Sequence, residues 1–136
     1  MMNYYLIGLG SNIQPERNIS RACKEIANYL DILNQSAVLI NPPCGNTLNF
    51  TFHNQILLIH SLQTAAELKS LFETLEIELG REPKCPERKF KDRTIDIDIL
   101  SQAETAADAL ATPLKETYNQ QIMRDWQPSH SNEDEC

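Results

Sequence analysis

The sequence lacks several features that would each have pointed to a particular class of protein. No apolar run approaches the roughly 18–20 residues that a membrane-spanning helix needs. The first residues, MMNYYLIGLGSN, contain no basic segment and no small-residue cleavage site, so we expect no secretory signal and a cytoplasmic protein. The four cysteines are scattered, without a C-x-x-C pair or cysteine and histidine at metal-binding spacing, which argues against a zinc site.

Positive charge is also scarce. The chain has 12 basic and 19 acidic residues, a formal net charge of −7, so we expect no partnership with nucleic acid or with acidic membranes. A chain of 136 residues with 41% hydrophobic content is long enough for the core of one domain. The last ten residues, QPSHSNEDEC, are polar and acidic, so we predict a single domain over residues 1–126 and a disordered tail over 127–136.

Hydrophobic periodicity predicts alternating strands and helices. Strands are expected at 3–11, 35–43, 49–62 and 93–100, and helices at 15–31 and 64–80. The second helix has the clearest signals, because Thr64 and Glu67 form a capping box and Gly80 can end the helix. The order is βαββαβ, which predicts the α+β class and a ferredoxin-like core with helices packed on an antiparallel sheet. Beyond residue 101 only helical tendencies remain, at 102–111 and 114–126.

The last predicted strand contains an unusual pair of aspartates. In the run RTIDIDIL, residues 93–100, Asp96 and Asp98 share one face of the strand, while the isoleucines between them occupy the other. Aspartate is uncommon in strands, and two adjacent carboxylates repel each other unless a cation lies between them. The pattern is compatible with an ordinary strand that has one solvated face, and a divalent-metal site is the second interpretation.

Half of the positive charge lies directly before this strand. Residues 81–93 hold six of the twelve basic residues and three acidic ones, so this segment carries +3 and the rest of the chain −10. Pro83 and Pro86 make the segment a loop rather than a helix. A solvated charged loop is one interpretation. A basic loop beside a divalent-cation site is also what phosphoryl-transfer chemistry needs, because cations neutralise the phosphates in transit.

Several motifs together resemble a known family. IGLGSN near the start, NPPCG at 41–45, FHNQ at 52–55, LEIELGR at 75–81 and RTIDIDIL at 93–100 follow one another as in 6-hydroxymethyl-7,8-dihydropterin pyrophosphokinases of the folate pathway. The resemblance implies a magnesium-dependent enzyme that transfers diphosphate from ATP to the hydroxymethyl group of the pterin and releases AMP. It also implies a monomer whose partners are these two small molecules. A non-catalytic relative that binds pterin or nucleotide as a sensor or accessory subunit is the alternative.

The resemblance also implies roles for individual residues. Asp96 and Asp98 match the ligands of two magnesium ions, and Arg81 and Arg93, which match arginines that flank a mobile catalytic loop, complete the implied catalytic set. For the pterin the implied contacts are Asn41, Pro43, Gly45, Phe52, Asn54 and Phe90. Phe52 would stack on the ring, and Asn54 would bond its polar edge. For ATP the implied set is Glu76, Arg81, Lys84, Arg88 and Arg93.

The C-terminal part departs from the family pattern. After the aspartate strand the family continues with a Pro-His motif, then an arginine and an aromatic residue. Here Pro113 is followed by Leu114, and Gln120 and Ile122 stand where the arginine and the aromatic residue are expected. We predict that Trp126 or Ile122 covers the second face of the pterin; the alternative is that Trp126 packs the last helix onto the core.

Overall fold

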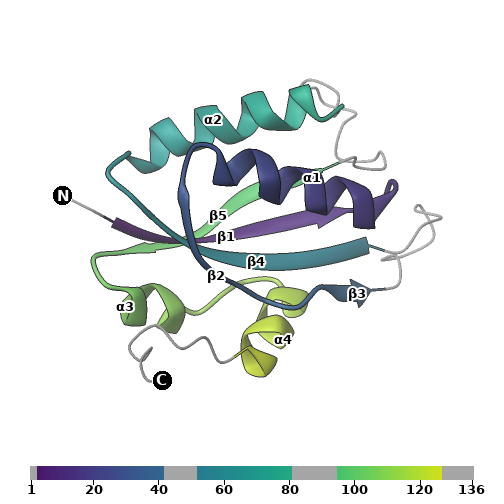
Figure 1. The fold of residues 1–136 in the computed structure, drawn as a ribbon. Helices are drawn as coiled ribbons and strands as arrows, with labels where there is room; N and C mark the ends of the chain where they lie inside the picture. The colour runs from purple at the N-terminus through teal and green to yellow at the C-terminus, as the bar shows by residue number, and fades with distance from the viewer. Residues whose placement is uncertain (1–2, 42–51, 81–94, 127–136) are drawn as a thin grey trace.

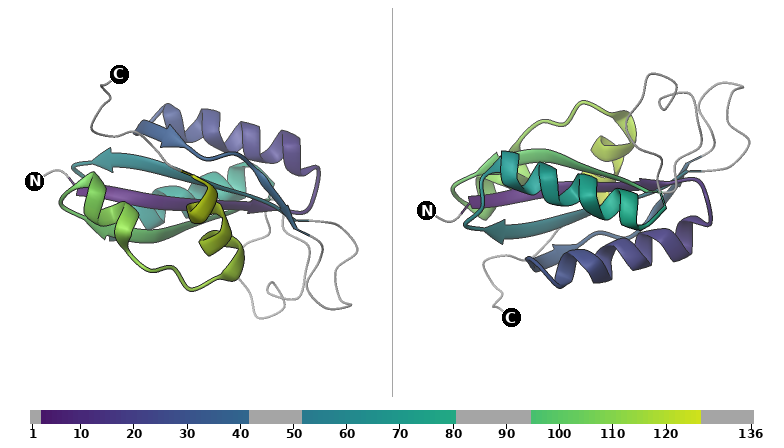
Figure 2. Two further views of the ribbon diagram at one scale, coloured as in Figure 1. Left: turned by 90° about the horizontal axis from the view of Figure 1, so that it is seen from below. Right: turned by 90° about the horizontal axis from the view of Figure 1, so that it is seen from above.

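The computed structural model describes residues 3–41, 52–80 and 95–126. Its elements are β1 (Asn3–Ser11), α1 (Pro15–Ala27), β2 (Asp31–Gln35), β3 (Leu39–Asn41), β4 (Phe52–Ser61), α2 (Ala65–Glu78), β5 (Asp96–Ala103), α3 (Ala106–Ala111) and α4 (Thr117–Asp125). α1 and α2 cover one face of the sheet, and α3 and α4 lie against the other (Figures 1 and 2). No described helix is long and apolar enough to cross a membrane.

The described strands form one antiparallel sheet. The order is β2–β4–β1–β5, and β3 pairs with β4 beyond the end of β2. The two central strands are thus β1 and β4, while β5, which carries both aspartates, lies at an edge. The predicted α+β class and the βαββαβ order are confirmed, with the second strand of that order divided in two.

The division of the second strand follows from one serine. The expected strand 35–43 is observed as parts of β2 and β3, separated by residues 36–38. The backbone N–H of Ser36 donates to the Ile56 carbonyl, and its side-chain oxygen accepts from the Ile56 N–H, both at 2.9 Å. Ser36 therefore satisfies both backbone groups of Ile56 where regular pairing with β4 is interrupted.

Other element boundaries differ from the expected ones by a few residues. α1 ends at Ala27 rather than at residue 31, and the chain enters β2 at Asp31. β5 spans Asp96–Ala103 rather than 93–100; residues 93 and 94 lie outside the described residues. The capping box of α2 is confirmed, since the Thr64 side chain accepts from the Glu67 N–H at 3.1 Å and Glu67 accepts from the Thr64 N–H at 2.8 Å.

Two apolar clusters hold the helices to the sheet. The larger lies under α1 and α2 and includes Tyr5, Ile7 and Leu9 from β1, together with Ile19, Ile26, Leu57, Ile59, Leu68, Phe72, Leu75, Ile95 and Ile97. The smaller lies under α3 and α4, and its buried members are Leu6, Ile56, Leu58, Ala109 and Ile122. Alternate residues of β1 thus enter opposite clusters, as the two-residue period of a strand requires.

Candidate active site

The aspartate pair projects from β5 away from the larger cluster. Ile95, Ile97 and Ile99 pack in the cluster under α1 and α2, so Asp96 and Asp98, which alternate with them, lie on the face of α3 and α4. Asp96 is half-buried and Asp98 is exposed. Residues two apart in a strand are roughly 6–7 Å apart, so the two carboxylates can reach neighbouring ligands in one site.

Two glycines of β1 lie beside the aspartates. In the register of the sheet Gly10 pairs with Asp96, and Gly8 pairs with Asp98. A Cβ atom added at Gly10 would come within 3.0 Å of the Asn54 Oδ1 atom, and one added at Gly8 within 3.1 Å of the Leu100 side chain. The absence of side chains at these two positions therefore allows Asn54 and Leu100 to lie over the central strand, next to the carboxylates.

β4 supplies the residues on the other side of the glycines. Asn54 pairs with Gly10, so Asn54, Gly10 and Asp96 form one row across three strands. Asn54 is buried and Phe52 is half-buried, and both occupy the same face of β4, two residues apart. The backbone of Asn41 in β3 pairs with Phe52. The structure thus brings the predicted pterin residues Phe52 and Asn54 to the face that carries the predicted metal ligands.

Glu76 of α2 contacts the aspartate strand from the opposite side. Its side chain is 5% exposed, and a carboxylate oxygen accepts a 2.7 Å hydrogen bond from the backbone N–H of Ile97. Ile97 stands between the two aspartates, on the edge strand of the sheet. Glu76 therefore holds β5 at the point where the metal ligands project, a contact that the helical pattern of the sequence did not reveal. The contact of Glu76 with ATP stays a prediction.

The C-terminal helix α4 borders this face through apolar contacts. Ile122 is 4% exposed in the smaller cluster, and Leu114 and Trp126 pack against the same cluster. The side-chain amide of Gln120 donates to the Leu114 carbonyl at 2.8 Å. These contacts favour the packing alternative for Trp126. They also place Leu114 and Gln120 in structural roles, where the family pattern has histidine and arginine.

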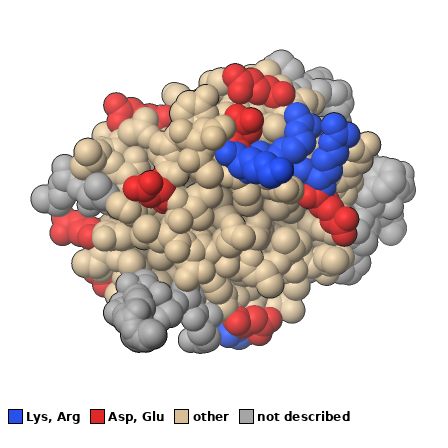
Figure 3. Space-filling model, in the orientation of Figure 1, with Lys and Arg blue, Asp and Glu red and all other residues tan. Residues whose placement is uncertain are grey.

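Several of the described positive charges lie on α1, on the other side of the sheet, while Lys115 and Arg124 lie just before and on α4. Lys and Arg gather over α1 in Figure 3, and this helix carries Arg17, Arg21 and Lys24. The predicted phosphate-binding and loop residues lie outside the described residues: Arg81, Lys84, Arg88, Phe90 and Arg93, as do Pro43 and Gly45 of the predicted pterin pocket. Their positions stay predictions.

Comparison with known proteins identifies the family of this chain. Residues 6–125 match the model of the 7,8-dihydro-6-hydroxymethylpterin-pyrophosphokinase family. The chain belongs to this family. A 2-amino-4-hydroxy-6-hydroxymethyldihydropteridine pyrophosphokinase of Helicobacter pylori is 33% identical over 104 residues, which cover 73% of this chain and 62% of the relative. The protein of the same name from Campylobacter jejuni is 34% identical over 101 residues, covering 70% and 60% of the two chains.

The match does not extend over the whole of these relatives. The aligned part spans about three fifths of the length of the two pyrophosphokinases. Both the aspartate strand and the first strand with its glycines lie within the residues that match the family model. The row of Asn54, Gly10 and Asp96 therefore falls within the part of the chain that matches the family.

The site is chemically suited to magnesium. Within the described residues no three histidine, cysteine, aspartate or glutamate side chains come together as a complete metal cage. Magnesium is commonly held by one or two carboxylates, with substrate phosphates and water completing the shell. A pair of aspartates, one half-buried and one exposed, fits this mode of binding better than it fits a closed structural metal site.

Proposed function

We propose that this chain transfers the terminal diphosphate of ATP to the hydroxymethyl group of 6-hydroxymethyl-7,8-dihydropterin and releases AMP, a step of folate biosynthesis. The observation that carries the proposal is the row of Asn54, Gly10 and Asp96 across three strands, with Asp98 beside it on the same face. The family membership and the names of the relatives from Helicobacter pylori and Campylobacter jejuni support the same chemistry.

In this proposal the two substrates meet at the face of the sheet that carries Asn54, Asp96 and Asp98. Asp96 and Asp98 hold the magnesium, expected as two ions, which when bound screens the phosphate charge and stabilises the transferring group. The Asn54 amide bonds the polar edge of the pterin, and Phe52 stacks against its ring. Gly10 allows the Asn54 side chain to lie over the central strand, in the row that contains Asp96.

The remaining proposed contacts come from the segments outside the described residues. Arg81 and Arg93 would bind phosphate oxygens in the bidentate manner that guanidinium groups allow, and Lys84 and Arg88 would add positive charge. Phe90 would help to close the site, and the backbone near Asn41, Pro43 and Gly45 would line the pterin pocket. We also propose a cytoplasmic monomer, in keeping with a net charge of −7 that disfavours nucleic acid and acidic membranes.

One assay tests the proposal. AMP is measured by chromatography after incubation with Mg-ATP, with and without the hydroxymethyl dihydropterin. We expect AMP only when ATP, magnesium and the pterin are all present. Pterin or nucleotide binding without any AMP would instead support a non-catalytic binding protein. This outcome has a structural basis in Leu114 and Gln120, which pack and bond locally where the family pattern has histidine and arginine.

A further inference from the structure

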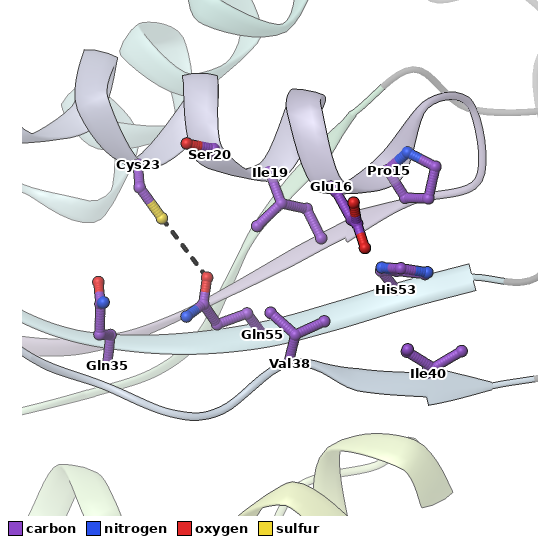
Figure 4. Close-up of a pocket in the computed structure, with 10 residues that line it drawn as sticks. All are labelled: Pro15, Glu16, Ile19, Ser20, Cys23, Gln35, Val38, Ile40, His53 and Gln55. Atoms are coloured by element: carbon purple, nitrogen blue, oxygen red, sulfur yellow. Dashed lines mark hydrogen bonds between the residues drawn. The ribbon is translucent and has the colours of Figure 1, made fainter.

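A cavity lies under α1, on the face of the sheet opposite the paired aspartates (Figure 4). Its volume is about 390 Å³, within the range of roughly 300–1,000 Å³ found for small-molecule sites. Ile19 projects into it from α1, and Val38 and Ile40 border it from the opposite side (Figure 4). The two apolar walls leave a space between helix and sheet that suits a flat molecule.

His53 of β4 is the most informative residue of this cavity. Its side chain is only 9% exposed, and no hydrogen bond of its imidazole is found within the described residues. Figure 4 shows the ring directed into the cavity, below Glu16 and Pro15. A buried polar group without a partner costs free energy, so an imidazole in this position indicates a missing hydrogen-bonding partner.

The other polar groups limit what that partner can be. The Gln55 amide is already bonded at both ends, since its oxygen accepts from the Cys23 thiol at 3.5 Å and its nitrogen donates to the Ser36 carbonyl at 2.7 Å. Burial raises the pKa of the Cys23 thiol, which is therefore neutral at pH 7. Among the described residues that line the cavity, Glu16 is the only one with a full charge.

We propose that this cavity is a second binding site, for a planar aromatic cation with an amidine-like N–H edge. Such an edge donates to the Glu16 carboxylate and to an imidazole nitrogen of His53, and the ring packs between Ile19 and the valine and isoleucine opposite it. An anion would be repelled by the Glu16 carboxylate, the one charged group among the described residues that line the cavity. The basic residues of α1, namely Arg17, Arg21 and Lys24, are absent from the described lining.

This site is separate from the proposed catalytic face, although both use β4. His53 and Gln55 line the cavity, while Phe52 and Asn54 alternate with them and face the aspartate side. Its existence does not depend on the proposed reaction. Direct binding is therefore the appropriate measurement, and it can succeed or fail whatever the AMP assay shows.

The test is a titration of the ¹⁵N-labelled full chain followed by ¹H–¹⁵N correlation spectra. The probe is benzamidine, and the matched control is benzoate, which has the same ring and the opposite charge. We expect benzamidine to shift the amide signals of Ile19, Cys23, His53 and Gln55 in a saturable manner. Benzoate should leave these signals unchanged. Glu16→Gln should weaken benzamidine binding roughly two- to fivefold, as expected for the loss of a partly exposed ion pair.

Three further variants assign the binding to the cavity. Val38→Trp should fill the space and abolish the shifts; Val38 is 42% exposed, so the fold should tolerate the larger ring. Leu33→Trp is the matched control, because Leu33 is 44% exposed on the neighbouring strand but does not line the cavity. Asn54→Ala alters the proposed pterin side alone and should retain benzamidine binding.

The proposal fails if the shifts are absent, or if Val38→Trp leaves the affinity unchanged. It fails equally if Asn54→Ala removes binding while Val38→Trp does not, because benzamidine would then occupy the catalytic face. Equal binding of benzoate would also overturn it, since the selection for a cation would be wrong.

Discussion

The face of the sheet under α1 and α2 and the face under α3 and α4 are formed by alternate residues of the same strands, but they bury different amounts of apolar surface. The first contains the larger cluster, with Phe72, Leu75 and Ile26 almost fully buried. The second has a smaller cluster and then gives way to glycines, an asparagine and two aspartates. The face under α1 and α2 therefore contributes most of the apolar packing. The face under α3 and α4 can carry polar residues because the stability of the sheet depends less on it.

The most direct test of this difference in stability is to remove one large side chain from each face. Phe72→Ala should lower the free energy of unfolding by about 3–5 kcal/mol, because a nearly fully buried ring is lost. Ile122→Ala, in the smaller cluster, should lower it by only about 2 kcal/mol. Urea denaturation measures both, and Ile77→Ala serves as a control because Ile77 is 53% exposed on α2. Equal losses at Phe72 and Ile122 would contradict the difference between the faces.

Removing a carboxylate from the polar face should reduce activity without reducing stability. Asp96→Ala and Asp98→Ala should each slow pterin-dependent AMP formation at least about a hundredfold, because a magnesium ligand is lost. The free energy of unfolding should stay the same or rise slightly, since one of two neighbouring like charges is removed. Steady-state kinetics and urea denaturation give the two values. Asp31→Ala, at an exposed position on β2, should keep normal turnover.

Glu76 connects the two faces, and its replacement should affect both stability and activity. Glu76→Ala leaves the Ile97 N–H without this acceptor and should lower the free energy of unfolding by about 1–3 kcal/mol. Glu76→Gln keeps an acceptor oxygen and should recover most of that loss. If Glu76 positions the aspartate strand, the magnesium concentration for half-maximal activity should rise in the alanine variant and recover in the glutamine variant. A parallel loss of activity in both variants would point to direct contact with ATP.

Gly10→Ala should give the smallest and most local effect. The new methyl group would meet the Asn54 side-chain oxygen at 3.0 Å, so the KM for the pterin should rise several-fold with little change in stability. Gly8→Ala is the matched control, because its methyl group would meet Leu100 instead and should alter stability more than pterin binding. Reversal of these two effects would show that Asn54 does not hold the pterin.

Much of the fold could be predicted because local signals agree with tertiary packing. β1 has the predicted bounds, and the capping box fixes the start of α2. The helix at 15–31 was predicted too long, because Leu30 continues the apolar stripe of α1. In the structure Leu30 is indeed buried in the same cluster, but it reaches the cluster from the turn that leads into β2. Apolar spacing alone does not show whether a buried residue belongs to the helix or to the turn that follows it.

The candidate site could be predicted only in part, for a related reason. A strand's period of two predicts that Asp96 and Asp98 share a face, and it needs no knowledge of neighbouring strands. The row of Asn54, Gly10 and Asp96 depends on the order and register of three strands, which no single segment encodes. The Glu76–Ile97 hydrogen bond and the cavity beside His53 arise from packing between elements, so the sequence contained no local signal for them.

The central position of β1 has a consequence for how the protein is made. β1 is the first of the described strands, but one of its partners, β5, is the last of them: Tyr4 pairs with Ala103. During synthesis one edge of β1 therefore stays unpaired until β5 has left the ribosome. Such distant pairings slow folding, because a large loop must close before they form. We expect the aspartate-bearing strand to join the sheet last, so that the proposed catalytic face forms only after β5 has been synthesised.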